Sequence, residues 1–422
     1  MMRSALVAAC GAAFLALAGA ALHAEAPAGI PVAVPGEARP VHVPGFVRAE
    51  GTRFVNPDGS TFHIRGMSFG NWLVPEGYMF KFHEALAPRE IEGVIEYLVG
   101  PEDAARFWRR FRDSYIREED IRFLKAAGFT TVRLPLHWKF FVDSDGAEGE
   151  GWALLDRVIG WCREAGIKAI IDLHAAPGGQ TGVNHDDGIG YPLMFYVPEY
   201  QRQTVDLWRR IAARYKDETA VLGYDLLNEP ISPYHDNDYL NPRLEPFYAR
   251  IIEAIRAEDR NHPVILAAAQ WSTNFDVFSR PLDSNSGYTY HKFWASPERR
   301  EVQSYLNFSN RWGVPLFLGE TGELTDEWNE KFRTMNESFG IGWSFWTYKN
   351  LDSRSTVVSI ARPPGWDAIA RFGDVPPELW PSLEKPPRDQ VLATLEAYLE
   401  GTRLARARIN ASYIASLGLT PP

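Results

Sequence analysis

The chain has 422 residues, of which 45% are hydrophobic and 23% are charged, as is typical of a soluble globular protein. Its formal net charge of −10 argues against nucleic acid as a partner, because two polyanions repel each other. The length is large for one domain, but it lies within the range of a barrel that carries insertions.

The amino terminus has the pattern of an export signal. Arg3 supplies a positive charge, residues 5–21 are an apolar run, and Ala24-Glu25-Ala26 offers a cleavage site. We therefore expect a signal peptide over residues 1–26 and a secreted or periplasmic protein without a stable membrane insertion, because the apolar run is short for a span. Removal of the signal leaves Cys162, which lies on a predicted helix and is expected to be a buried thiol.

Residues 27–47, rich in Pro, Ala and Gly, are expected to be a linker. From there the chain alternates short apolar runs with helical patterns, which predicts an α/β protein with a parallel sheet. The predicted strands cover residues 62–66, 130–133, 167–173, 221–227, 264–268, 288–290, 315–318 and 342–345, and the clearest helices cover residues 118–127, 200–215, 244–258 and 297–312. Eight strands with intervening helices predict a (β/α)8 TIM barrel over residues 48–350.

Two segments exceed a minimal barrel. Residues 74–117 form a long insertion after the first strand, with helical patterns over residues 90–98 and 104–112. Residues 351–422 form a C-terminal extension with a helix predicted over residues 388–408, expected to pack on the barrel. The acidic run 323–327 is expected to begin a helix, where the helix dipole favours negative charge.

Polar residues stand at the ends of several predicted strands. In a (β/α)8 barrel these ends meet at one mouth, where the reactive groups gather. The residues in such positions are Arg133, Asp172, His174, Asn228, Glu229, His291, Glu320 and Trp346. Glu229 and Glu320 are separated by roughly three βα units, which would place their carboxylates on facing sides of the mouth.

A facing pair of carboxylates is what glycosidic bond cleavage requires. One carboxylic acid protonates the leaving oxygen, and the other carboxylate attacks the anomeric carbon or activates water. Arg133, with its permanent charge, is suited to keep the attacking carboxylate ionised, and Asn228 could hold a sugar hydroxyl. The alternative is a pair of structural ion pairs, and that reading is preferred for Asp172 and Asp225, which lie inside strands.

Seven segments, in chain order, resemble glycoside hydrolase family 5, in particular its cellulase and exo-glucanase branches. The segment around Asn228-Glu229-Pro230 resembles that family's signature, and the segment Phe317-Leu318-Gly319-Glu320 resembles its nucleophile strand. The remaining segments are Thr131-Val132-Arg133-Leu134-Pro135, Asp172-Leu173-His174, Ala176-Pro177-Gly178-Gly179-Gln180, Tyr290-His291 and Trp343-Ser344-Phe345-Trp346. The resemblance covers most of the predicted barrel and not the extension.

The resemblance implies a role for each matched residue. Glu229 would be the acid/base, Glu320 the nucleophile and Asn228 the ligand of the 2-hydroxyl. Arg133, His174 and His291 would orient the carboxylates, although both histidines could also be satisfied core residues, and Trp346 would floor the sugar subsite. The family usually has a tyrosine where this chain has Phe293, so the nucleophile lacks a donor unless Tyr290 or another group replaces it.

Other aromatic and polar residues are weaker candidates. His137 and Trp138 could line the sugar-binding subsites or simply pack, Trp72 could extend the same wall, and Trp271 could serve the leaving-group side. A metal site from His174, His185, Asp186 and Asp187 can be imagined, but the spacing lacks the usual zinc pattern. Residues 185–187 are therefore expected to be a substrate-facing or solvated stretch, and no metal or other cofactor is expected.

These features together predict a monomeric, retaining glycosidase that acts on an oligo- or polysaccharide, a β-glucan or a related β-linked glycan. Two alternatives stay open. The same machinery could act on mannan, a glycolipid or a furanoside. The chain could also be a carbohydrate-binding barrel with weakened catalysis, of which Phe293 would be a symptom.

Overall fold

The computed structural model describes residues 45–142 and 148–422. The predicted signal peptide and nearly all of the predicted linker lie outside the described residues. Among the described helices, none combines the length and the apolar character that a membrane span requires.

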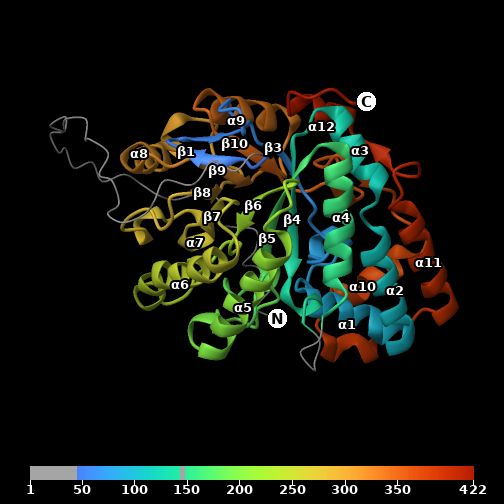
Figure 1. The fold of residues 1–422 in the computed structure, drawn as a ribbon. Coiled ribbons are helices and arrows are strands. Elements are labelled where there is room, and N and C mark those ends of the chain that lie inside the picture. The colour runs from blue at the N-terminus through green and yellow to red at the C-terminus, as the bar shows by residue number, and fades with distance from the viewer. Residues whose placement is uncertain (1–44, 143–147) are drawn as a thin grey trace, which may run out of the picture. The chain divides into compact units, whose positions relative to one another are not determined.

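Eight parallel strands close into a barrel within the described residues (Figure 1), which confirms the predicted (β/α)8 fold. They are β3 (Arg65–Ser68), β4 (Thr131–His137), β5 (Lys168–Ala175), β6 (Val221–Asp225), β7 (Val264–Ala267), β8 (Ser286–His291), β9 (Leu316–Glu320) and β10 (Gly342–Phe345). The last strand pairs with the first, Trp343 opposite Arg65, so the sheet has no free edge.

The first barrel strand lies further along the chain than the predicted run 62–66. Phe62 instead donates its backbone N–H to the carbonyl of Phe54 in β2 (Arg53–Val55). β2 in turn forms a hairpin with β1 (Arg48–Glu50). Phe54 enters the bottom of the barrel, where a Cβ on Gly287 would lie 2.4 Å from its ring. A small apolar cluster therefore closes the end opposite the strand carboxyl ends; its members are Val47, Phe54, Ile64, Ile170, Leu222, Ile265 and Phe317.

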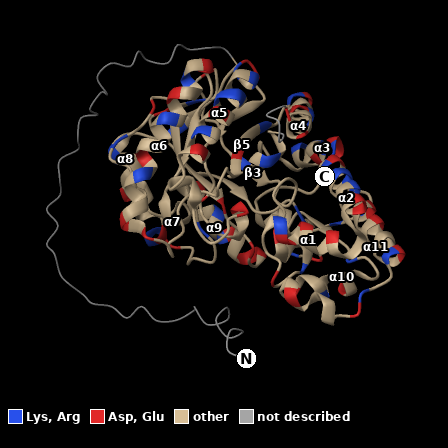
Figure 2. Cartoon of the chain, turned by 90° about the horizontal axis from the view of Figure 1, so that it is seen from below, with Lys and Arg blue, Asp and Glu red and all other residues tan. Residues whose placement is uncertain are grey.

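Helices surround the strands and cover them with apolar faces. They are α3 (Glu118–Ala127), α4 (Gly151–Ala165), α5 (Pro198–Tyr215), α6 (Asn237–Glu258), α8 (Gln303–Trp312) and α9 (Asp326–Ser338). Lys, Arg, Asp and Glu alternate along the outward sides of these helices in Figure 2. Cys162, on α4, is fully buried, as expected.

Helix boundaries differ from the predicted ones at several places. α6 begins seven residues before the predicted 244, with Pro242 and Pro246 inside it. α8 begins only at Gln303, after a single 3-10 turn, η6 (Arg299–Glu301). Both differences arise in first turns, where backbone N–H groups have no partner within the helix, so sequence pattern constrains the start poorly.

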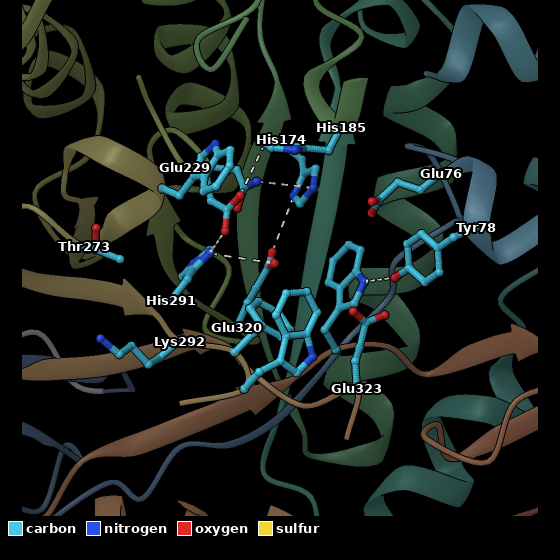
Figure 3. A pocket seen from close by; sticks show the side chains of 15 residues that line it. Glu76, Tyr78, His174, His185, Glu229, Thr273, His291, Lys292, Glu320 and Glu323 are labelled. Atoms are coloured by element: carbon cyan, nitrogen blue, oxygen red, sulfur yellow. Dashed lines mark hydrogen bonds and ion pairs between the residues drawn. The ribbon is translucent and has the colours of Figure 1, made fainter. Parts of the chain in front are cut away.

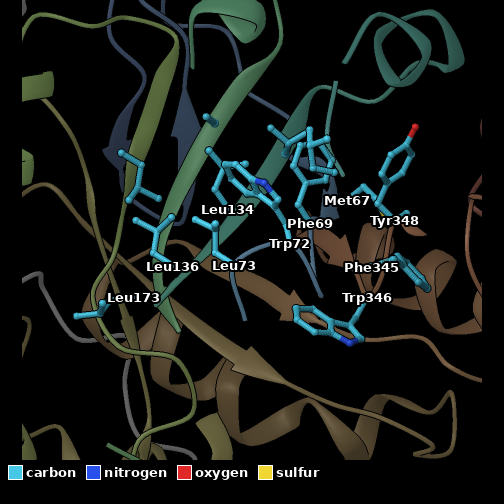
Figure 4. Close-up of a cluster of buried hydrophobic side chains, with 14 of the residues drawn as sticks. Met67, Phe69, Trp72, Leu73, Leu134, Leu136, Leu173, Phe345, Trp346 and Tyr348 are labelled. Carbon is cyan, nitrogen blue, oxygen red and sulfur yellow. The ribbon is translucent and has the colours of Figure 1, made fainter. Parts of the chain in front are cut away.

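The insertion after β3 contains η1 (Gly77–Phe80), α1 (Pro88–Val99) and α2 (Pro101–Ser114). α1 and α2 correspond to the helical patterns predicted at 90–98 and 104–112, and each begins earlier than predicted. Trp72, at its start, is buried and donates its indole N–H to the carbonyl of Arg112 at 2.8 Å. It packs among Met67, Phe69, Leu73 and Leu134 (Figure 4), so Trp72 belongs to the core and not to the wall of a site.

The C-terminal extension contains β11 (Lys349–Leu351), β12 (Val358–Ile360), α10 (Trp366–Gly373), η7 (Pro377–Ser382), α11 (Arg388–Gly401), β13 (Arg408–Ile409) and α12 (Ala411–Ser416). The predicted helix 388–408 ends at Gly401, because the chain turns there to pair β13 with β12. The boundary that we propose between the barrel (48–350) and the extension (351–422) falls within β11.

The insertion and the extension pack on each other. α1 and α2 lie beside α10 and α11 in Figures 1 and 2. Trp366 stacks on Phe82 and Tyr398 and donates its indole N–H to the carbonyl of Phe80 at 2.8 Å. Arg110 on α2 makes two hydrogen bonds to Glu396 on α11, at 2.5 and 2.7 Å. Segments far apart in the sequence thus form one helical layer beside the barrel.

Candidate active site

The carboxyl ends of the barrel strands open into a pocket of about 440 Å³ (Figure 3). Its lining combines strand ends, loops and the insertion: Glu76, Tyr78, His174, His185, Asn228, Glu229, Trp271, Thr273, His291, Lys292, Phe293, Trp294, Glu320, Glu323 and Trp346. A pocket of this size at this end of a barrel is the usual place for a small-molecule site.

Arg133, on β4, is completely buried and connects the acidic groups of the site. Its guanidinium donates to Asp225 and to Asn228, each at 2.9 Å, and lies 3.1 Å from Asp172. It also forms an ion pair with Glu320. Burial alone would lower the pKa of Arg133, but the surrounding carboxylates raise it, so the charge is retained.

Asp172 lies inside β5, and Asp225 is the last residue of β6 rather than an interior one as predicted; both pair with Arg133, which confirms the structural role that was expected for them. Burial raises the pKa of Asp172 to about 7 and that of Asp225 to about 6, although Arg133 acts in the opposite direction. Removal of the guanidinium would leave two buried carboxylates without their partner.

Glu320 ends β9 and is buried at the base of the pocket. Besides Arg133, it faces the Nδ1 atoms of His174 at 3.8 Å and of His291 at 3.7 Å. Burial raises the pKa of its carboxyl, while His291 and Arg133 oppose this shift. The direct guanidinium contact favours the ionised form of Glu320, as a nucleophile requires.

Glu229 follows β6 and has a backbone φ of 44°, in the left-handed region that a residue with a side chain seldom adopts. Its carbonyl accepts a hydrogen bond from the Thr181 hydroxyl at 2.8 Å, which helps to hold this conformation. Its carboxyl oxygens face two imidazoles, Oε1 being 2.9 Å from His291 Nδ1 and Oε2 being 3.2 Å from His185 Nε2. Burial raises the pKa of Glu229, and His185 and Arg133 oppose this shift.

The two carboxyl groups are close. One oxygen of Glu229, one oxygen of Glu320 and one nitrogen of His291 all lie within 4.8 Å of one another. Three such donors could also hold a metal ion, but Glu320 is already neutralised by Arg133. The short separation leaves little room for a water molecule between the carboxylates and a bound sugar.

His174, on β5, is held from three sides. Its Nδ1 lies 2.8 Å from Asp172 Oδ2, its Nε2 lies 3.3 Å from the amide nitrogen of Asn228, and its ring stacks on Trp346 at 5.3 Å between centroids. With Nδ1–H donating to Asp172, Nε2 accepts from Asn228 and thereby fixes the orientation of that amide. Burial lowers the pKa of His174 far below its usual value, and it lowers that of His291 to about 4, so both rings are neutral near pH 7.

The insertion contributes residues to the pocket that were not expected from the sequence. Tyr78, on η1, accepts a hydrogen bond from the indole N–H of Trp346 at 2.7 Å and contacts Glu323. Glu76 lies beside them, and burial together with Glu323 raises the pKa of its carboxyl well above the ordinary value. Figure 3 shows Glu76, Tyr78 and Glu323 on one side of the pocket, with Glu229 and His291 on the other.

Glu323 does not begin a helix, as the acidic run suggested. α9 begins at Asp326, and Glu323 adopts a left-handed φ of 59° that turns its side chain into the pocket. The signal available for Glu76 is its place in the loop after β3, eight residues beyond Ser68, because βα loops form the mouth of a barrel. No pattern distinguished Glu323 from Asp326 and Glu327, which do lie in the first helical turn.

Further aromatic residues line the pocket. They include Trp271, which was predicted to serve the leaving-group side, together with Phe293 and Trp294. Trp271 and Trp294 both have left-handed backbone φ angles, of 57° and 55°, and 65% of Trp294 is exposed. Strained aromatic residues at the rim of a pocket are more common at binding sites than elsewhere.

Several residues proposed for the site do not reach the pocket. The Tyr290 hydroxyl donates to Asn336 on α9 and the ring stacks on Tyr305, so Tyr290 does not replace the hydroxyl that is absent at Phe293. His137 is buried and contacts Asp187 at 3.3 Å. Trp138 packs against the core. Proximity to Arg133 in the sequence predicted both residues near the sugar, but His137 ends β4, Trp138 begins η2 (Trp138–Phe140), and neither residue lines the pocket.

Residues 185–187 are neither solvated nor arranged as metal ligands. The Asp186 carboxylate accepts backbone N–H groups of Thr181 at 2.6 Å, Gly182 at 2.9 Å and Gly188 at 2.8 Å. Burial raises the pKa of Asp186 to about 6, and these three amides oppose the shift. Asp186 therefore organises its own loop, which presents His185 to the pocket.

Comparisons with known proteins agree with this geometry. Residues 101–352 match the family model described as "Cellulase (glycosyl hydrolase family 5)". The chain is 28% identical over 352 residues to a β-xylosidase of Phanerodontia chrysosporium, covering 74% of this chain and 72% of that protein. It is 30% identical over 286 residues to a glucan 1,3-β-glucosidase of Pichia angusta, covering 63% of each chain.

Solved structures show the same fold. An endogalactoceramidase aligns with a TM-score of 0.58 and 17% identity, over 90% of this chain and 86% of that one. A rutinosidase from Aspergillus niger aligns with a TM-score of 0.56 and 19% identity, over 69% and 91% respectively. With the family match, the closed barrel and the pocket described above, the chain belongs to glycosyl hydrolase family 5 and is a glycosidase.

Proposed function

We propose that this glycosidase cleaves a β-linked glycan with retention of configuration, with Glu320 as the nucleophile and Glu229 as the acid/base. The observation that carries the proposal is the short separation, within 4.8 Å, of carboxyl oxygens from the two residues. Retaining enzymes have their carboxyl groups about 5 to 5.5 Å apart, whereas inverting enzymes need roughly 6.5 to 9.5 Å to admit a water molecule.

In the first step, the Glu320 carboxylate attacks the anomeric carbon and forms a covalent ester. Glu229 transfers its proton to the glycosidic oxygen as the bond from that oxygen to the anomeric carbon breaks, and the leaving group departs as an alcohol. Arg133 supports this step because it keeps Glu320 ionised in a buried setting. Asn228, held by Arg133 and His174, is positioned to bind the hydroxyl next to the anomeric carbon.

In the second step, Glu229 is a carboxylate and takes a proton from water. The water oxygen bonds to the anomeric carbon, the ester bond breaks, and Glu320 returns as a carboxylate. The net reaction consumes one water molecule and needs no cofactor. Two inversions at one carbon give a product with the configuration of the substrate.

The pocket favours a terminal sugar of a β-glucan or a related β-linked glycan. Glu76 and Tyr78, from the insertion, line the side of the pocket away from Glu229 and His291, where they would limit the length of a bound glycan. Trp346 offers a flat face beside Glu320, and its indole nitrogen is held by Tyr78. The relatives named a β-xylosidase and a glucan 1,3-β-glucosidase support this substrate class.

We further propose that residues 1–26 direct export and are removed. Amino-terminal sequencing of the protein recovered from its producing cells should then begin at or near Pro27. A mature chain that retains Arg3 would contradict this part of the proposal. Neither the chemistry nor the site depends on it.

The proposed function is tested with a panel of aryl β-glycosides and β-glucans, with product sizes and the first-formed anomer read by NMR. Glu320→Ala should abolish turnover without changing the fold, and Glu229→Ala should lose turnover of poor leaving groups but form a β-glycosyl azide when azide is added. Glu327→Ala, an exposed glutamate on α9, is the matched control and should keep full activity.

Each alternative corresponds to a result of the same panel. Release of the α-anomer first, or near-normal turnover in Glu320→Ala, would contradict the proposed mechanism. Preference for mannans, glycolipids or furanosides would keep the mechanism and change the substrate. Sugar binding without turnover by the unmodified protein would indicate the weakened binding barrel.

A further inference from the structure

The loop that follows β5 carries a histidine to the second oxygen of the acid/base. His185 lies in η3 (Asn184–Asp186), and its Nε2 is 3.2 Å from Glu229 Oε2. The side chains of both residues are largely buried, with 16% and 15% exposed. Nε2 is buried without a hydrogen bond of good geometry, so in the free enzyme the contact with Glu229 is close but poorly aligned.

Glu229 is thus held between two imidazoles. His291 contacts Oε1, and His185 contacts Oε2. A carboxyl group fixed at one oxygen can rotate about its last bond, whereas one fixed at both cannot. Orientation matters because a displacement of about 1 Å in a catalytic group can cost on the order of 100-fold in rate.

The loop that carries His185 is rigidly built. The Asp186 carboxylate binds three backbone amides of the loop. Gly179 and Gly188 leave room for that carboxylate, since a Cβ on either would lie within 3 Å of it. Gln180 donates to the carbonyl of Asn228 at 2.8 Å, and the Thr181 hydroxyl donates to that of Glu229.

The insertion fastens the same loop from outside. Arg89, in the first turn of α1, donates its backbone N–H to Asp187 Oδ1 at 3.0 Å and its guanidinium to the Asp187 carbonyl at 2.6 Å. His137, from the end of β4, contacts the other oxygen of Asp187. Lys139 ties the same region to Glu92 on α1, at 2.8 Å. The insertion, the loop and the acid/base therefore form one chain of contacts.

Resting on the proposed function, we infer that His185 is a positioning residue for the acid/base Glu229, and that Arg89 holds His185 in place through Asp187. Burial lowers the pKa of His185, with Glu229 opposing the shift, so the ring is neutral near pH 7 and can bond to either protonation state of Glu229. The other ionisable groups around Glu229 are Glu76 of the insertion, Arg133 of β4, Asp172 and His174 of β5, His291 of β8 and Glu320 of β9.

The experiment compares leaving groups. A 2,4-dinitrophenyl β-glycoside departs without a proton, whereas a phenyl or alkyl β-glycoside needs general-acid help, which is worth about 10²- to 10⁴-fold. His185→Leu should lower kcat/KM for the phenyl substrate roughly 10- to 100-fold and change the dinitrophenyl substrate less than about threefold. Arg89→Gln should show the same pattern with a smaller loss.

The controls separate positioning from structure. His63→Leu, an exposed histidine just before β3, and Arg110→Gln, an exposed ion pair of the same insertion, should change neither substrate. If His185→Leu does not fold, Arg89→Gln alone carries the test, because the partly exposed Arg89 side chain contacts Asp187 and does not line the pocket.

Equal losses on both substrates, or no loss on either, would overturn the inference. The unmodified protein separates this failure from failure of the proposed function. If it hydrolyses no aryl β-glycoside, the proposed function fails, whereas turnover that is insensitive to His185 removes only the inference about positioning.

Discussion

Two walls of the pocket are built in different ways. One is built on the barrel strands, with His174, His291 and Glu320 at or near the ends of β5, β8 and β9, and with the buried Arg133 of β4 as their support. The other is made by loops and the insertion, with Glu76, Tyr78, His185 and Glu323. In the proposed mechanism, the first wall carries the nucleophile and its supporting groups, and the second wall would enclose the sugar and support the acid/base.

The difference lies in what fixes each side chain. Strand-end residues are placed by the hydrogen-bonded register of a closed sheet, such as His291 opposite Glu320. Loop residues are placed by single tertiary contacts, such as Tyr78 with Trp346 or Asp187 with Arg89. Damage to the first wall should therefore cost both folding and catalysis, while damage to the second should cost less and more selectively.

The largest effect is expected for Arg133→Met. It leaves Asp172 and Asp225 buried without their cation, which should lower the free energy of unfolding by about 5 kcal/mol, and it removes the partner of Glu320, so activity should be lost. Denaturant unfolding and kcat measure the two effects. Arg256→Met, which breaks a largely buried pair with Asp283 outside the pocket lining, should lose stability and keep activity. A stable, active Arg133→Met would contradict the strand-wall account.

Trp366→Ala tests the support of the second wall. Trp366 is fully buried between the insertion and the extension, so its loss should lower the free energy of unfolding by about 3 to 5 kcal/mol. We expect KM to rise more than kcat falls, because η1 carries Tyr78 and not the reacting carboxylates. Leu379→Ala, at an exposed leucine on η7, is the matched control. A fall in kcat at unchanged KM would show that the insertion also affects the reacting carboxylates, and would contradict the separate roles given to the two walls.

The pH dependence of stability probes the strand wall. Because burial lowers the pKa of His291 from 6.5 to about 4, the unfolded chain binds a proton in this range that the folded chain does not. This contribution lowers the free energy of unfolding as pH falls from 6.5 towards 4, by at most about 1.4 kcal/mol per pH unit. His291→Gln removes this contribution. The free energy of unfolding of the variant, relative to that of the unmodified protein, should therefore rise by up to this slope as pH falls. A parallel pair of curves would refute this expectation.

The smallest effect is expected for Tyr78→Phe. It removes the acceptor of the Trp346 indole N–H and a partner of Glu323, which should cost about 1 kcal/mol of ground-state binding, or roughly fivefold in KM. Initial rates on a good aryl β-glycoside measure it, with Tyr196→Phe, at a half-exposed tyrosine, as control. A loss confined to kcat would place Tyr78 with the reacting groups instead.

The sequence predicted the strand wall well and the loop wall poorly, for the same physical reason. Apolar runs and the polar residues within or soon after them are local features, so Arg133, Glu229 and Glu320 could be assigned to the barrel mouth without knowing the structure. Tyr290 does not reach the pocket, because neighbouring side chains along a strand point to opposite faces and His291 faces the pocket. Glu323 reaches the pocket through a left-handed turn, and His185 reaches it through a loop organised by the buried Asp186 carboxylate. Neither feature produces a periodic pattern in the sequence.

The packing of Trp366 on Phe80 has a consequence for how the protein is made. The two residues contact each other although 286 positions separate them in the chain. During synthesis the barrel strands up to β10 emerge before α10 and α11. The insertion therefore lacks the helices on which it packs until nearly the whole chain is present. Enzymatic competence should therefore arise at the end of synthesis, as a property that nascent chains lack.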